Sequence, residues 1–251
     1  MAGGLFASVL YNHQFALRVE ATYGKLSAHD SILKGINDIA KARFNRNLGY
    51  RTDIKEISLI AEIHPLYIFS ELFGSDREPP RYSPYLLAGI GYYAFNPQAK
   101  LGDEWIDLQP LSTEGQGFKE YPNRPPYKLH QINVPVGGGI RHEISPRLNI
   151  RGEFILRKLF TDYLDDLSTT YINPAVFANY FSGTKLANAL ILNDRQLVPV
   201  TDPNGGSKRG TLSERDSYFT FNFKLGFNII GSGIDSEKQR QKKQLRCPAF
   251  F

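Results

Sequence analysis

Large apolar residues alternate with polar residues along several segments of this chain. A period of two residues is typical of a β-strand whose two faces meet different surroundings. The clearest case lies near the end of the chain, where every second residue is apolar: Phe219, Phe221, Phe223, Leu225, Phe227 and Ile229. Residues 217–230 are therefore predicted to form a strand with one apolar face and one polar face.

Six further segments show the same alternation, so seven strands are predicted in all. They are residues 4–12, 14–26, 55–64, 83–95, 130–144 and 147–160. The links between them are short near 13 and 146 and intermediate at 65–82. Three links are long: 28–49, 96–128 and 162–216. In an antiparallel meander all three long links leave from the same end.

Short turns at one end and long loops at the other are typical of a transmembrane up-and-down β-barrel of the bacterial outer membrane. Only a closed barrel lets strands satisfy their backbone groups within lipid. The expected fold class is therefore all-β: an eight-stranded outer-membrane barrel over residues 1–230, followed by a basic periplasmic tail over 231–251. The expected lipid-facing residues are Leu17, Val19, Ile57, Leu59, Val134, Val136, Ile150, Phe154, Phe219, Phe221, Phe223, Leu225 and Phe227.

The opposite faces of these strands carry charges of both signs at mid-strand. Five cations and five carboxylates are expected to pair inside the barrel: Arg18, Arg141, Arg151, Arg157 and Lys224 with Glu20, Glu56, Glu62, Glu143 and Glu153. A soluble barrel or sandwich would instead turn the apolar face inward, and alternation alone does not separate the two. The paired mid-strand charges favour the membrane barrel. Eight strands enclose an interior just filled by side chains, which excludes a wide channel.

Composition adds limits to this picture. The chain has 251 residues and a net charge of +5, much of it in the basic tail, so no face suited to nucleic acid is expected. No apolar run is long enough for a transmembrane helix, and the opening residues do not resemble a signal peptide.

An even strand number is the rule for such barrels. The count of seven therefore predicts that a first strand and its signal peptide are missing from this sequence. The less favoured alternative is an extra element at 68–74.

Several segments resemble a known family. They include "ALRVEATYGKLSAHDS", "RNLGYRTDIKEISLIAEI", "SPYLLAGIGYYAFNP", "LQPLSTEGQG", "RKLFTDYLDDLSTTY" and the closing "RCPAFF". They are similar to a family of outer-membrane barrels in Bacteroidota that includes PorG, a component of the type IX secretion and gliding apparatus. The resemblance implies a location in the bacterial cell outer membrane and an accessory role in protein transport. It also implies partners among the periplasmic ring proteins of that secretion system.

Two other function classes stay open. The protein could be a small surface barrel that binds a ligand or a partner protein through its outer loops. A lipid-modifying enzyme would need a Ser–His–acid cluster near the outer boundary, and the five histidines form no such motif. We therefore expect no enzyme activity and no cofactor. His64 is expected to be a polar residue at a strand end.

Three smaller features carry candidate chemistry. Asp162, Asp165 and Asp166 could supply oxygen ligands to Ca²⁺, but their spacing fits no known loop, and a solvated, loop-ordering turn is favoured. Trp105 is expected to anchor its loop at a membrane boundary. The tail could dock a periplasmic partner through Arg246, Cys247, Phe250 and Phe251.

Overall fold

The computed structural model describes residues 2–11, 13–36, 38–72, 82–145, 147–198, 205–210 and 215–229. Seven main strands run along the molecule: β1 (Ala2–Tyr11), β2 (Phe15–His29), β3 (Gly49–Ile63), β4 (Tyr82–Leu101), β6 (His130–Ser145), β7 (Leu148–Leu159) and β10 (Ser217–Phe227). The connections contain η1 (Asp30–Leu33), α1 (Asp38–Arg46), α2 (Pro65–Leu72), β5 (Glu104–Asp107), η2 (Gln109–Leu111), β8 (Thr170–Ile172), η3 (Pro174–Asn179), α3 (Gly183–Asn193) and β9 (Gly205–Lys208).

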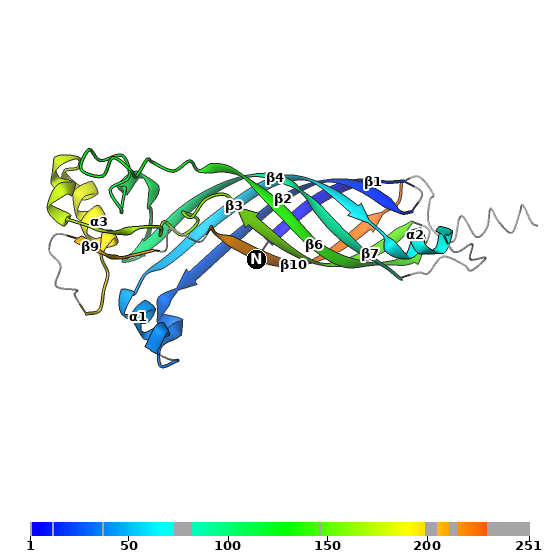
Figure 1. The fold of residues 1–251 in the computed structure, drawn as a ribbon, viewed down its shortest axis with the longest axis horizontal. Coiled ribbons are helices and arrows are strands. Elements are labelled where there is room, and N and C mark those ends of the chain that lie inside the picture. Colours follow the sequence, from blue (N-terminus) through cyan, green and yellow to red (C-terminus); the bar gives the residue numbers. More distant parts are fainter. Residues whose placement is uncertain are drawn as a thin grey trace, which may run out of the picture.

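The seven main strands form one antiparallel sheet in the order β1-β2-β3-β4-β6-β7-β10, as the alternation predicts. The sheet curls into a half-barrel whose long axis is the long axis of the molecule (Figure 1). Within the described residues, β1 pairs only with β2 and β10 pairs only with β7. The main body of the structure is therefore an antiparallel β-sheet with the curl of a barrel. In the part of the chain that the structure describes, β1 and β10 are the two free edges of this sheet.

The three long links all lie at one end of the sheet, which we call the long-loop end (Figure 1). They hold more regular structure than the sequence predicts. β2 extends to His29, inside the expected loop 28–49, which also contains α1. β4 runs to Leu101 and turns back through β5, so the expected loop 96–128 begins with a hairpin. The expected loop 162–216 contains α3 and the two-stranded sheet β8-β9.

The opposite, short-turn end holds the β1–β2 and β6–β7 turns and α2. The less favoured alternative of an extra element at 68–74 adds no strand over its described part, because Pro65–Leu72 is helical. No described helix is both long and apolar enough to cross a membrane.

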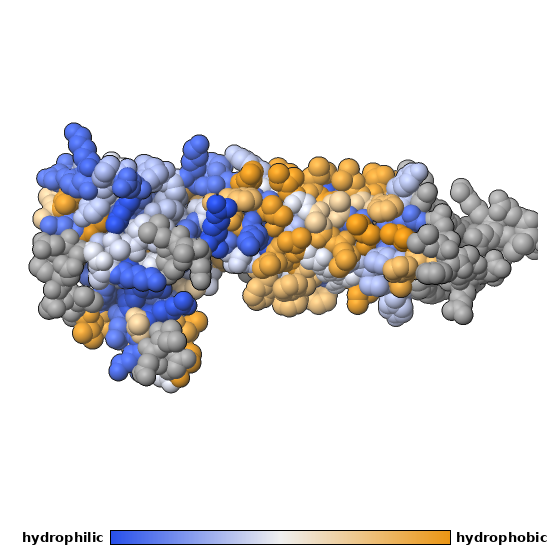
Figure 2. Space-filling model, in the orientation of Figure 1, coloured by the Kyte–Doolittle hydropathy of each residue, from blue (hydrophilic) through white to orange (hydrophobic). Residues whose placement is uncertain are grey.

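Alternation sorts the side chains between the two faces of the curled sheet. On β10 the residues Phe219, Phe221 and Phe223 are 60%, 71% and 94% exposed. Arg18 and Ile60, cross-strand neighbours on β2 and β3, are both fully buried on the concave face. Figure 2 shows apolar surface over the strands on the face in view, and hydrophilic surface over the long-loop end.

Candidate functional site

The concave face of the sheet gathers all ten charges that the sequence predicts inside the barrel. They come from five strands: Arg18 and Glu20 on β2, Glu56 and Glu62 on β3, Arg141 and Glu143 on β6, Arg151, Glu153 and Arg157 on β7, and Lys224 on β10. Nine of them are no more than 6% exposed, and the Lys224 side chain is 10% exposed. Because each strand places alternate residues on one face, the spacing of these residues is enough to bring them together.

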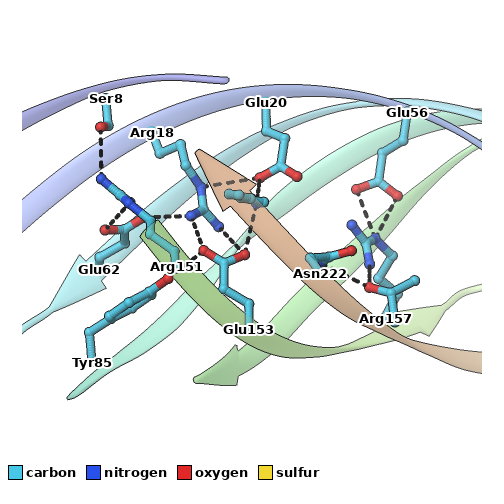
Figure 3. A network of polar contacts seen from close by, with 12 residues as sticks. Ser8, Arg18, Glu20, Glu56, Glu62, Tyr85, Arg151, Glu153, Arg157 and Asn222 are labelled. Atoms are coloured by element: carbon cyan, nitrogen blue, oxygen red, sulfur yellow. Dashed lines mark hydrogen bonds and ion pairs between the residues drawn. The ribbon is translucent and has the colours of Figure 1, made fainter. Parts of the chain in front are cut away.

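The largest cluster is centred on Arg18 (Figure 3). Its guanidinium lies 2.5 Å from the Glu153 carboxylate and 2.8 Å from that of Glu62. Arg151 donates to Glu62 at 3.1 Å, and Lys224 Nζ lies 2.6 Å from Glu20 and 2.7 Å from Glu153. The contact between Lys224 and Glu20 ties β10 to β2, two strands that are not hydrogen-bonded neighbours.

A second cluster surrounds Glu56, closer to the long-loop end (Figure 3). Arg157 donates to both Glu56 oxygens at 2.9 and 3.0 Å. Asn133 and Tyr218 donate to the same carboxylate at 2.9 and 3.1 Å. Arg157 also donates to Thr220 at 2.8 Å, so β7 and β10 are joined across their inner faces.

A third pair, Arg141 and Glu143, lies toward the short-turn end with an N–O distance of 2.7 Å. Buried charges lose their hydration, and each must regain that energy from a partner and from further hydrogen bonds. The concave face meets this demand with an equal number of cations and carboxylates. Each of the ten charges has a partner of opposite sign on this face.

One group of residues on this face has the types that a nucleophilic enzyme uses. His64 Nδ1 lies 2.9 Å from Ser83 Oγ, and His64 Nε2 lies 3.6 Å from a Glu62 oxygen. The order of hydroxyl, imidazole and carboxylate is that of a Ser–His–acid triad, but the ring nitrogens are exchanged, because in the triad Nε2 faces the hydroxyl and Nδ1 faces the carboxylate. The distance from His64 Nε2 to Glu62 is also too long for a hydrogen bond. Ser83 is only 3% exposed, and Glu62 is held by Arg18 and Arg151. The group lies at the short-turn end, opposite the long loops.

The residues predicted to face lipid lie on the convex face. Twelve of the thirteen are at least 40% exposed, and Val134 is half-buried. The most exposed are on β10, at the free edge of the sheet. This side of the half-barrel is continuous and apolar, whereas the concave side is charged.

The long-loop end carries a folded cap, which we define as the described residues of 102–128 and 162–210. Its apolar core includes Leu111, Phe118, Phe177 and Leu192, all at most 4% exposed. Phe118 stacks on Tyr180 with ring centroids 4.0 Å apart, which joins the two segments of the cap. The long loops therefore have a core of their own.

A buried polar centre also joins the two cap segments. The Glu114 carboxylate accepts hydrogen bonds from the backbone N–H groups of Ser168 and Thr169, at 3.1 and 2.8 Å, and from Arg209 at 3.0 Å. Arg209 donates further to the backbone carbonyl oxygens of Asp166 and Asn193, at 2.6 and 3.2 Å. Glu114 and Arg209 are 0% and 3% exposed, so this pair is among the most buried in the molecule.

Of the three aspartates in the acidic segment, Asp166 is the one bound into the polar centre of the cap. Asp166 is fully buried and accepts hydrogen bonds from Tyr127 at 2.8 Å and from the Thr113 hydroxyl. Burial raises the pKa of Asp166 to about 6, against the lowering effect of Arg209. Asp166 therefore orders the loop, but it is not solvated as expected. No group of three ligating side chains suited to a metal ion occurs among the described residues.

Trp105 lies on β5 in the hairpin at the long-loop end, and the Arg51 guanidinium covers its ring at 3.9 Å. It is 38% exposed. The expected docking residues Arg246, Cys247, Phe250 and Phe251 lie outside the described residues.

Comparison with known proteins adds no family: no family model, curated protein or solved structure matches this chain. The resemblance to the Bacteroidota barrel family therefore rests on the quoted segments. Two of these segments, "PLSTEGQG" and "LFTDYLDDLSTTY", meet in the cap through the Glu114 hydrogen bonds. Sequence reasoning missed Glu114 and Arg209 because loops carry no periodic signal. A carboxylate and an arginine in polar loop sequence look like ordinary surface residues.

Proposed function

We propose that this protein is a non-enzymatic transmembrane β-barrel of the bacterial outer membrane. The observation that carries the proposal is the orientation of the sheet, with apolar side chains on the convex side and ten paired charges on the concave side. Soluble proteins rarely leave so continuous an apolar surface in water. Acyl chains are the natural cover for a band of this kind around a barrel.

Within that membrane, we propose that the protein acts as an accessory of the type IX secretion apparatus and links the membrane to a periplasmic ring. The support is the sequence resemblance together with the topology. All long loops leave from one end, and β10, the last described strand before the basic tail in sequence, ends at Phe227 at the opposite, short-turn end. On the outer-membrane topology that end faces the periplasm.

A second candidate function is ligand or partner binding at the cell surface. The folded cap favours it, because loops with no binding role would not need an apolar core and a buried Glu114–Arg209 pair. The two functions use opposite ends of the molecule, so one protein can serve both.

The membrane proposal is tested by a charge on the convex face. Phe223→Lys places a cation where the side chain is 94% exposed, and such a substitution costs about 2–4 kcal/mol at the middle of the bilayer. We expect the variant to be lost from the outer-membrane fraction, together with its heat-modifiable band on gels. Asn222→Ser, on the concave side of the same strand, should assemble normally. Normal assembly of Phe223→Lys would contradict the proposal.

The secretion role is tested separately by deleting residues 236–251. The truncated protein should keep its heat-modifiable barrel and lose co-purification with periplasmic ring proteins from native membranes. Unchanged co-purification would rule out the tail as the docking element.

A further inference from the structure

A cavity of about 280 Å³ lies between the cap and the described residues of 28–50, which contain η1 and α1 and which we call the α1 arm. Its walls come from segments far apart in sequence: the end of β2 and η1, α1 and the start of β3, the loop at Asp165, and the segment after α3. A second cavity, of about 500 Å³, continues from it toward the β4–β5 hairpin. The two share Ala28, His29, Ile32, Gly49, Tyr50 and Arg195, so they form one groove.

Hydrogen bonds fix the walls of this groove. Arg46 binds both oxygens of Asp30, at 2.9 and 3.0 Å, and donates to the backbone oxygen of Arg209 in the cap at 3.0 Å. Asn47 donates to the backbone oxygen of Arg195 at 3.1 Å. Because both cap contacts come from the residues at the end of α1, the arm and the cap are held at a fixed separation. A rigid concave site is what small-molecule binding requires.

The groove has more cations than anions to match them. Arg46 is neutralised by Asp30, and Arg209 by Glu114. Within the described part of the chain, Arg43, Arg195 and Lys100 have no carboxylate within ion-pair distance. The other lining carboxyl group is Asp165, whose pKa burial and the Asp216 charge raise to about 8, so it is mostly uncharged at neutral pH. Three cations are thus left to attract a negatively charged ligand.

The rest of the lining is aromatic and aliphatic. Tyr50 and Ile32 line both cavities, and Trp105 lines the second. Arg51 covers one face of the Trp105 ring and holds its orientation. The groove is much larger than a bare phosphate ion needs, and aromatic rings pack well against the apolar faces of sugar rings. We propose that this groove binds a phosphorylated sugar, with Arg43 and Arg195 on the phosphate and Trp105 beside the ring.

Trp105 is the single tryptophan of the chain, so its fluorescence reports directly on the groove. We expect glucose 6-phosphate, added to the full chain in detergent, to change this fluorescence in a saturable way, and glucose at the same concentration to have no effect. The Arg43→Gln/Arg195→Gln double variant should bind at least ten times more weakly. Lys185→Gln, which removes an exposed cation of α3 outside the groove, should bind as the unmodified protein does.

Three results would overturn the inference: no saturable change with any sugar phosphate, equal binding by the double variant with an unaltered near-ultraviolet circular dichroism spectrum, or equal affinity for inorganic phosphate. A phosphorylated sugar could be free or could belong to a lipopolysaccharide headgroup. Tighter binding of phosphorylated, deacylated lipopolysaccharide core than of glucose 6-phosphate would assign the headgroup, and the reverse order would assign the free sugar. The measurement is made in detergent and does not depend on where the protein resides in the cell.

Discussion

The Glu114 carboxylate lies 2.8 Å from the backbone nitrogen of Thr169, a residue 55 positions later in the chain. This hydrogen bond joins the segment after β5 to the segment after β7. The same carboxylate holds Arg209, which comes just after β9. Three parts of the cap thus depend on one side chain that no pattern in the sequence distinguishes.

Replacing Glu114 by Gln should loosen the cap and leave the strands intact. The change removes the nearer of the two carboxylates that pair with Arg209, whose other partner is Asp166 at 3.7 Å, and breaking a buried ion pair costs up to about 3–5 kcal/mol. We expect faster cleavage of residues 102–128 and 162–210 by an added protease, read by mass spectrometry, with unchanged heat modifiability of the barrel. Glu120→Gln is the control, because Glu120 is in the same segment but binds Tyr180 and Asn179 at the surface. Equal protease resistance of Glu114→Gln and Glu120→Gln would contradict the prediction.

Glu153→Gln should destabilise the half-barrel itself. The Glu153 carboxylate lies within 2.7 Å of Arg18, Lys224 and the Tyr85 hydroxyl. The uncharged amide of the Gln variant removes a negative charge that balances the buried cations Arg18 and Lys224. The expected loss is again about 3–5 kcal/mol of unfolding free energy, measured by urea titration in detergent or lipid vesicles. Asp53→Asn removes a carboxylate whose ion pair with Lys25 is partly exposed, with side chains 37% and 42% exposed, and it should cost at most about 1 kcal/mol. Similar losses for the two variants would show that the interior network contributes little.

Gly137→Ala tests the close approach of β6 and β7. A Cβ at Gly137 would lie 2.1 Å from the Phe154 carbonyl oxygen, and a backbone atom cannot move aside without shifting the strand. We expect poor assembly and a lower urea midpoint. Gly152→Ala, on the neighbouring strand, meets no atom within 4 Å and should assemble as the parent chain does. If both variants assemble equally well, the backbones of β6 and β7 at Gly137 are farther apart than the structure shows.

The strands could be predicted because apolar and polar residues alternate along them with a period of two. Every second residue is apolar or small from Phe219 to Phe227 in β10 and from Leu148 to Leu156 in β7. This alternation determines both that the segment is a strand and which of its faces turns to the interior. The inner charges followed from the same register. Their individual partners did not, because the pairing of Arg18 with Glu153 depends on the curl of the sheet across five strands.

The cap could not be predicted, because its contacts join loop residues that have no common period. The sequence suggested long loops at one end, and that holds. It did not suggest the β4–β5 hairpin, whose strand residues Gln98 and Lys100 read as ordinary polar loop sequence. It also suggested a solvated role for Asp166, which the structure buries against Tyr127. Burial of that kind comes from the partner segment and is not visible in the local composition.

Asp165 should make the stability of the cap depend on pH. Burial and the Asp216 charge raise the pKa of Asp165 from 3.8 to about 8 in the folded protein. The folded state therefore favours the protonated form, and the stabilisation is complete below about pH 4 and lost as the pH rises through about 8.

Asp165→Asn cannot ionise, so it should keep that stability at high pH. We expect its thermal midpoint, followed by Trp105 fluorescence, to exceed that of the parent chain by at least about 4 °C at pH 9, and the gap to shrink toward pH 5. Asp103→Asn, in the exposed turn before β5, should leave the pH profile of the parent unchanged. A gap for Asp165→Asn that is the same at pH 5 and pH 9 would mean that this carboxyl group is ionised over the whole range, and that the groove holds one more negative charge than we infer.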